Sequence, residues 1–219
     1  MNIHIVVEGV KGAAKVYEIW VPLVNPRLTY VSHISDIVND NFSIVGGGGY
    51  PQYLEIIDAA IDDVNNYRNI QRLVIGVDSE EFSYQEKYRE IEDHISSLPC
   101  LAEIRIVVQH FCLETWALGN EVIVKTHPNS DVLRKYVNFF NVRVEDPELL
   151  PGYSEEELNR AQFAAKYLKY ALNDKYKELT YSKSNPTALL HHKYFGRVKQ
   201  RLQNTGHISS FAHFLGAFV

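Results

Sequence analysis

Three carboxylates follow aliphatic segments in the first half of the chain. Glu8 ends the segment IHIVVE, and Asp78 and Glu80 end the segment LVIGVDSE. Aliphatic runs of this kind are typical of parallel strands, and ligands bind at the carboxyl ends of such strands. Carboxylates that meet there repel one another unless a cation joins them, and hard oxygen ligands suit Mg²⁺ or Mn²⁺ better than zinc. The pattern predicts a metal site at these three acids, although any one of them alone would be typical of a solvated loop.

Strand and helix patterns alternate through this half of the chain. Aliphatic runs predict strands and amphipathic periodicity predicts the helices between them. The expected strands are 3–7, 42–45, 73–77 and 104–108, and the expected helices are 11–23, 51–65, 84–97 and one that opens at 113–118. The alternation predicts an α/β fold, with a parallel sheet of about four strands and flanking helices.

Helical patterns dominate after residue 125, apart from a short strand pattern at 142–144. Ser154 and Glu157 have the spacing of a capping box, which predicts a long helix that runs to about Leu179. Two further helices are expected at 189–202 and 209–218. We therefore predict two domains, an α/β domain over 1–125 and a mostly helical C-terminal region over 126–219.

The order of the motifs in residues 1–125 resembles that of TOPRIM domains. The shared features are a first strand followed by Glu8-Gly9, a second strand that ends in glycines, and a third strand that ends acid-x-acid at Asp78 and Glu80. The segment HFCLETWALGN resembles an element of the small stand-alone TOPRIM proteins of bacterial defence islands, where Glu114 and Trp116 match. The chain departs from the usual Asp-x-Asp pair at Glu80, which is one methylene longer but keeps the charge.

The resemblance implies a metal-dependent nuclease that cuts DNA or RNA as a cytoplasmic effector of antiphage defence. Glu8 would act as general acid/base and share the metal, and Asp78 and Glu80 would hold Mg²⁺ or Mn²⁺. Glu81 and Glu114 are additional candidates for this site. Gly9 would let a phosphate approach the backbone closely.

Two other functions stay open at this point. A TOPRIM-like domain without catalysis would bind a partner, such as a separate ATPase subunit. A phospho-receiver module also places acids after its first and third strands. Here the first strand offers the single acid Glu8, and no fifth strand ending in Lys is apparent. These two features disfavour the receiver.

The net charge of −5 is divided unevenly along the chain. Residues 161–219 carry nine Lys/Arg and two Asp/Glu, a net charge of +7, which leaves −12 for the first 160 residues. Lys193, Arg197 and Arg201 recur every four residues and would share one helix face, with Lys199 close by. This stripe predicts contact with the phosphate backbone of a nucleic acid. A basic helix that docks on acidic parts of the same molecule would show the same pattern.

The composition is that of a globular protein without a membrane segment. The chain has 219 residues, of which 46% are hydrophobic, and no apolar run approaches the roughly 20 residues that cross a bilayer. Cys100 and Cys112 lack a metal-binding spacing and indicate reduced thiols, as expected in the cytoplasm. The apolar face of the C-terminal segment SSFAHFLGAFV would suit a homodimer contact or closure of the core.

Overall fold

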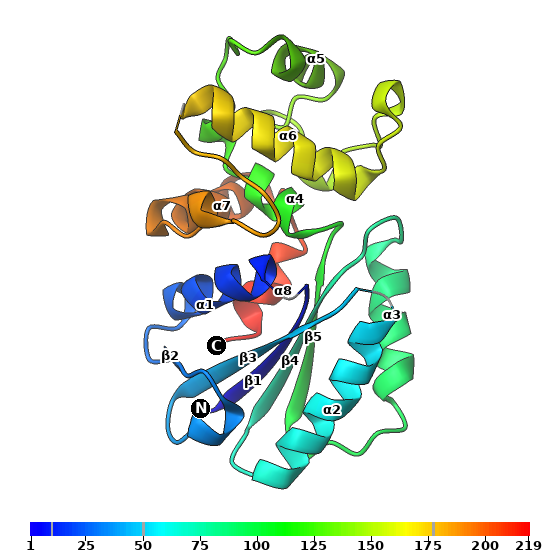
Figure 1. Ribbon diagram of the computed structural model, residues 1–219, viewed down its shortest axis with the longest axis vertical. Coiled ribbons are helices and arrows are strands. Elements are labelled where there is room, and N and C mark those ends of the chain that lie inside the picture. Colours follow the sequence, from blue (N-terminus) through cyan, green and yellow to red (C-terminus); the bar gives the residue numbers. More distant parts are fainter. Residues whose placement is uncertain (10, 50, 177) are drawn as a thin grey trace. The chain divides into compact units, whose positions relative to one another are not determined.

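The computed structural model describes residues 1–9, 11–49, 51–176 and 178–219 (Figure 1). The chain forms two compact units. The sheet unit contains residues 1–77, 84–108 and 213–219, and the helical unit contains residues 78–83 and 109–212. The chain enters and leaves each unit more than once, so this division differs from the single boundary predicted near residue 125.

A five-stranded parallel sheet forms the centre of the sheet unit, which confirms the predicted α/β fold. The strands are β1 (Ile3–Glu8), β2 (Thr29–Tyr30), β3 (Asn41–Gly47), β4 (Arg72–Asp78) and β5 (Glu103–Gln109). Their order across the sheet is β2-β3-β1-β4-β5. The prediction of about four strands missed β2, because a strand of two residues shows no periodicity.

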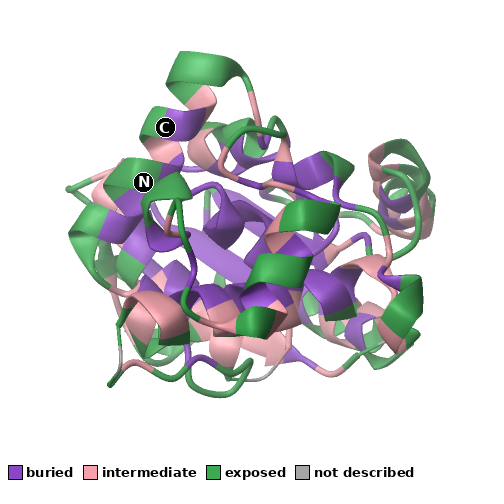
Figure 2. Cartoon of the chain, turned by 90° about the horizontal axis from the view of Figure 1, so that it is seen from above, coloured by how far each residue is buried: buried purple, intermediate pink, exposed green. Residues whose placement is uncertain are grey.

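Helices cover both faces of this sheet (Figure 1). They are α1 (Gly12–Val24), α2 (Gln52–Tyr67), α3 (Tyr84–Ile95) and, from His213 onward, the end of α8 (Phe211–Gly216). Tyr17 and Trp20 of α1 pack edge-on against Phe214 of α8, with ring centroids 5.0 and 6.2 Å apart. Figure 2 shows buried residues along the strands, while the covering helices turn exposed residues outward. The sheet unit is thus a layered structure around an apolar core.

In the part of the chain that the structure describes, the helical unit consists of helices joined by loops and 3-10 turns. The helices are α4 (Leu113–Leu118), α5 (Asp131–Phe139), α6 (Arg160–Lys175) and α7 (His192–Thr205). The 3-10 turns are η2 (Glu121–Ile123), η3 (Pro147–Leu149), η4 (Ser154–Glu156) and η5 (Thr187–Leu189), and the sheet unit has η1 (Ile34–Asp36). These helices confirm that helical structure dominates the C-terminal region.

Two local predictions for this region are wrong. The helix predicted from Ser154 begins only at α6, because Glu157 adopts a left-handed conformation with φ of 54° and ends η4. Asn159 and Gln162, which have the same spacing, form the capping box instead. The predicted end of this helix includes Lys177, which lies outside the described residues. The strand predicted at 142–144 is a turn, in which the N–H groups of Val144 and Glu145 donate to the Asn141 carbonyl.

The fold also bears on the membrane and cysteine predictions. None of the described helices combines the length and the apolar character that crossing a bilayer requires. Cys100 and Cys112 are both free thiols, and Cys112 is buried.

Candidate carboxylate site

Two neighbouring strands of the sheet end in carboxylates. β1 and β4 run in parallel, with Val7 beside Gly76, and β1 ends on Glu8 while β4 ends on Asp78. Glu8 belongs to the sheet unit, whereas Asp78 begins a segment of the helical unit. The joint site of Glu8 with Asp78 and Glu80 therefore stays a prediction from strand order.

The backbone geometry of Gly9 gives this residue a structural role beside the predicted one. Gly9 has a φ of 91°, a conformation that L side chains rarely adopt, and this requirement accounts for a glycine directly after Glu8. Its N–H donates to the Gly47 carbonyl at 2.8 Å. Gly9 therefore turns the chain at the end of β1 with its own donor already used within the sheet unit.

The segment after Asp78 is held by backbone hydrogen bonds within the helical unit. The N–H of Ser79 donates to the Gln109 carbonyl at 3.1 Å, and that of Glu80 donates to the Phe111 carbonyl at 2.8 Å. Glu80 has a φ of 48° and an exposed side chain. These bonds fix the backbone that presents Asp78 and Glu80, so both acids come from a defined turn and not from a loose loop.

Glu81, the predicted substitute ligand, has a structural partner. Its Oε1 accepts a hydrogen bond from the backbone N–H of Arg160 at 2.9 Å. Arg160 is the first residue of α6, where unpaired N–H groups and the helix dipole favour a negative charge. Glu81 therefore stabilises the start of α6, and this bond competes with a role as metal ligand.

Glu114 lies inside the helical unit on α4. Only 3% of the residue is exposed, and its Oε1 accepts a hydrogen bond from the Tyr181 hydroxyl at 2.6 Å. Burial, together with the charge of Glu114 and this hydrogen bond, raises the pKa of Tyr181 far above its usual value, so the phenol stays protonated. Sequence reasoning did not connect Tyr181 with Glu114, because the two residues are 67 positions apart and Tyr181 belongs to no helix or strand.

The pKa of Lys183 depends on the charges of the predicted carboxylates. Burial lowers the pKa of its ammonium group, but the charges of Glu114 and Asp78, and more weakly that of Glu80, outweigh that effect and raise it. The charges of Asp78, Glu80 and Glu114 thus all favour the protonated form of Lys183. No sequence signal identified Lys183, since a lysine in a polar loop is commonplace.

Two other reactive side chains near this cluster are kept neutral. Burial, followed by the charge of Arg160, lowers the pKa of His110 to about 4, although Asp146 opposes the shift. The His110 ring hydrogen-bonds Ser79, with Nδ1 2.7 Å from Oγ. Burial and the neighbouring Glu114 raise the pKa of the Cys112 thiol. At neutral pH neither group is charged, so both act as structural neighbours of the carboxylates.

The predicted basic stripe divides into exposed and buried members on α7. Lys193 and Arg197 are exposed and Lys199 is half-buried. Arg201 is buried, and its guanidinium donates to the Glu121 carboxylate and to three backbone carbonyls. These bonds remove Arg201 from the surface stripe. The three remaining cations keep the predicted role as candidates for phosphate contact.

Asp78 and Glu80 are the residues that would hold the predicted Mg²⁺ ion. Across the described ranges, no group of three or more His, Cys, Asp or Glu side chains is arranged to hold a metal. Mg²⁺ in proteins is usually held by one or two carboxylates together with substrate phosphates and water. Asp78 and Glu80 supply such carboxylates on a fixed turn, while Glu114 is already engaged by Tyr181.

Comparison of the chain with protein-family models, with curated proteins and with solved structures finds no match. The class of protein that the fold defines is therefore an α/β protein with a parallel sheet and an attached helical unit. The resemblance to TOPRIM domains is carried by the order of the short motifs and stays a prediction.

Proposed function

We propose that this protein is a Mg²⁺-dependent nuclease of the TOPRIM type, which cleaves phosphodiester bonds in DNA or RNA. The observation that carries the proposal is that the paired strands β1 and β4 end on Glu8 and Asp78, with Glu80 on the hydrogen-bonded turn that follows. The charges of Asp78, Glu80 and Glu114 also act on Lys183. A negative potential that raises the pKa of the exposed Lys183 also attracts a divalent cation. The order of the strand-end motifs supports the same reaction.

Each residue has a distinct role in this proposal. Asp78 and Glu80 would hold the ion, which supplies charge neutralisation at phosphorus and an activated water when bound. Glu8, at the end of the adjoining strand β1, would transfer the proton as general acid/base. Lys183 stays protonated and would bind a phosphate oxygen of the substrate. Glu114 would hold the local potential negative through its bond to Tyr181.

The exposed cations of α7 would contact the nucleic acid away from the cleaved bond. Lys193, Arg197 and Lys199 lie within two turns of one helix and form no ion pair with a carboxylate among the described residues. Contacts to phosphates carry no sequence information, so this surface would bind DNA or RNA without sequence preference.

A second candidate function follows from the same group of residues, Asp78, Glu80, Glu114 and Lys183. Lys183 already supplies a positive charge to the carboxylates, and Tyr181 already bonds Glu114. A cluster compensated in this way needs no metal for stability. The protein would then be a non-catalytic subunit that binds a partner such as an ATPase.

Calorimetric titration with Mn²⁺ separates the two candidates. The nuclease proposal predicts that the wild type binds Mn²⁺ and that Asp78→Asn binds it about tenfold or more weakly, since one of two carboxylate ligands is lost. Asp63→Asn, which changes an exposed acid of α2, is the matched control and should bind as the wild type does. Metal binding should also lower the pKa of Lys183, which NMR of labelled lysine measures.

Two results would contradict the proposal. Equal Mn²⁺ affinity of the wild type and Asp78→Asn would place the metal elsewhere. A wild type that binds no Mn²⁺, with an unchanged Lys183 pKa, would favour the non-catalytic subunit.

A further inference from the structure

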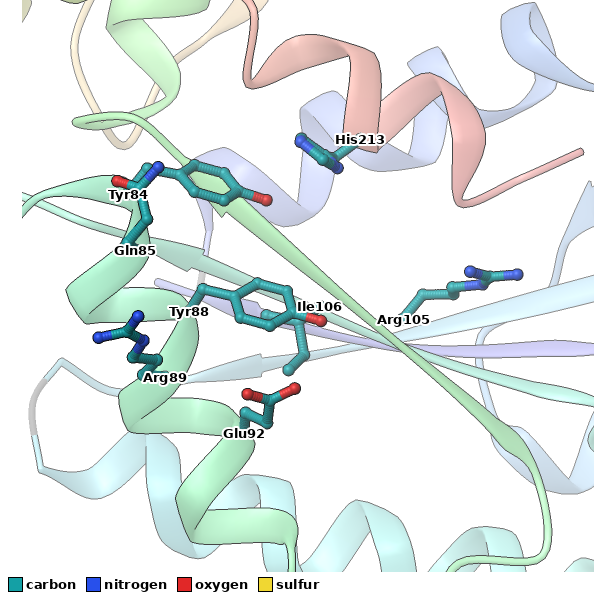
Figure 3. A pocket seen from close by; sticks show the side chains of 8 residues that line it. All are labelled: Tyr84, Gln85, Tyr88, Arg89, Glu92, Arg105, Ile106 and His213. Atoms are coloured by element: carbon teal, nitrogen blue, oxygen red, sulfur yellow. The ribbon is translucent and has the colours of Figure 1, made fainter.

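The sheet unit has a groove of its own, formed by α3, β5 and His213 (Figure 3). Its volume is about 480 Å³, within the range of sites that bind small organic groups. The side chains that matter for its chemistry are Tyr84, Tyr88, Arg89, Glu92, Arg105 and His213. Aromatic and charged groups thus line the same surface.

Three rings form a row on one side of the groove. Tyr84 stacks on Tyr88 with ring centroids 6.2 Å apart and planes inclined by 20°, and on His213 at 5.1 Å and 28°. Figure 3 shows both tyrosine rings projecting from α3 toward β5. Planar rings of this kind are the surfaces on which nucleobases stack, because every base has a π-face.

Cations lie on both sides of these rings. Arg105 lies on the β5 side, and Arg89 lies on α3, where it also lines the groove (Figure 3). Arg105 is paired with Glu103 of its own strand. Arg89 is exposed and forms no ion pair with any described carboxylate. A guanidinium with free donors is suited to a phosphate, which it can bind through two parallel hydrogen bonds.

We infer that this groove binds single-stranded nucleic acid, with a base on the Tyr84–Tyr88 rings and the flanking phosphates at Arg89 and Arg105. A base in a duplex is covered by its neighbours in the stack, so only an unpaired base can reach the rings. Glu92 at the same surface would accept a hydrogen bond from an amino group of a base. The inference rests on the proposed function and adds to it that single-stranded nucleic acid is the substrate class.

Fluorescence anisotropy in EDTA tests this binding apart from metal and cleavage. Labelled oligothymidine and oligouridine are the ligands, a duplex of equal length is the comparison, and free thymidine monophosphate is the competitor. Tyr88→Leu keeps apolar volume but loses the stacking face, so we expect about 5- to 150-fold weaker binding. Tyr88→Phe keeps the face and should bind within about twofold of the wild type.

The charge contribution has its own variant and controls. Arg89→Gln should weaken binding and reduce the salt slope by about 0.7, the value for one phosphate contact on a single strand. Tyr67→Leu and Arg27→Gln change exposed residues of the same unit outside the groove and should leave binding unchanged. Thermal denaturation of each variant shows whether it is folded.

Wild-type affinity in a folded Tyr88→Leu protein would overturn the inference, as would equal affinity for the duplex. Displacement of the strand by low concentrations of thymidine monophosphate would assign the groove to a free nucleotide instead of a strand. If the groove fails these tests, the prediction of Mn²⁺ binding at Asp78 is unaffected. If the protein binds no Mn²⁺, the result of the titrations in EDTA is unaffected. The two failures are therefore distinguishable.

Discussion

The two units differ in which interactions are most prominent in their interiors, although buried Arg72 and Lys87 of the sheet unit also form ion pairs, with Glu103 and Glu90. In the sheet unit, aliphatic side chains of α2, such as Ile57 and Ile61, pack with strand residues such as Leu73 and Ile75, and all four are almost fully buried. In the helical unit, buried charged groups join the elements. Arg201 donates to Glu121 and to three carbonyls, and other bonds of this kind are Glu148 with Ser209 and Ser210, Lys125 with Asp174, and Glu114 with Tyr181.

This difference explains why charges are harder to interpret in the helical unit. Burial of apolar surface is non-directional, so a periodic pattern is enough to predict it. A buried charge is stable only with specific partners, which lie far away in sequence. Arg201 and Glu81 look like surface or ligand residues in the sequence, yet both bond inside the helical unit. Function in this unit therefore has to be argued from the charges that stay accessible.

The largest effect that tests this comparison should come from Arg201. Arg201→Gln removes the guanidinium and leaves buried carbonyl groups without donors, so we expect the free energy of unfolding to fall by about 3 kcal/mol. Urea denaturation at neutral pH measures it. Arg197→Gln, one turn earlier on α7 and exposed, is the matched control and should change stability by less than about 0.5 kcal/mol. Equal effects of the two changes would contradict the assignment of Arg201 to the interior.

A smaller effect should come from His4, one of the polar residues buried in the sheet unit. Burial lowers the pKa of His4 to about 4, and its Nδ1 lies 2.7 Å from Ser43 Oγ. The unfolded chain binds the proton near pH 6.5, whereas the folded chain does not until about pH 4. Stability that is fully present above pH 6.5 is therefore lost as the pH falls toward 4.

The difference between the wild type and His4→Gln isolates this contribution. Between about pH 7 and pH 4.5, the wild type should lose about 2 kcal/mol more of its unfolding free energy than the variant does. Urea titrations at both pH values provide the measurement. His110, with a similarly lowered pKa, should leave a residual slope in the variant. Parallel pH profiles for the two proteins would show that His4 does not titrate in this way.

The sequence predicted the sheet unit better than the helical unit. The run 3–7 matches β1 because its aliphatic residues are buried whatever their exact partners, whereas the two residues of β2 gave no pattern. The capping box at Ser154 failed because a second box of equal spacing follows at Asn159. Local spacing could not choose between them.

The candidate site was predictable only in part for a similar reason. Asp78 and Glu80 were predicted because they end an aliphatic strand, and Glu114 was predicted through a family resemblance. Tyr181 and Lys183, which set the charge around these acids, lie in a loop after α6 with no periodic pattern. Their role depends on distances that only the folded chain defines.

Metal-dependent cleavage by the purified protein tests the central claim most directly. Single-stranded DNA and RNA, duplex DNA and transfer RNA are incubated with Mg²⁺, Mn²⁺ or EDTA. The account predicts cleavage by the wild type with metal, none in EDTA, and a rate about 100-fold or more lower for Asp78→Asn and for Glu8→Gln. The Glu8→Gln variant should bind Mn²⁺ more tightly than the Asp78→Asn variant, because the change at Glu8 mainly removes proton transfer. Cleavage that continues at the wild-type rate in Asp78→Asn, or that proceeds equally in EDTA, would contradict the account.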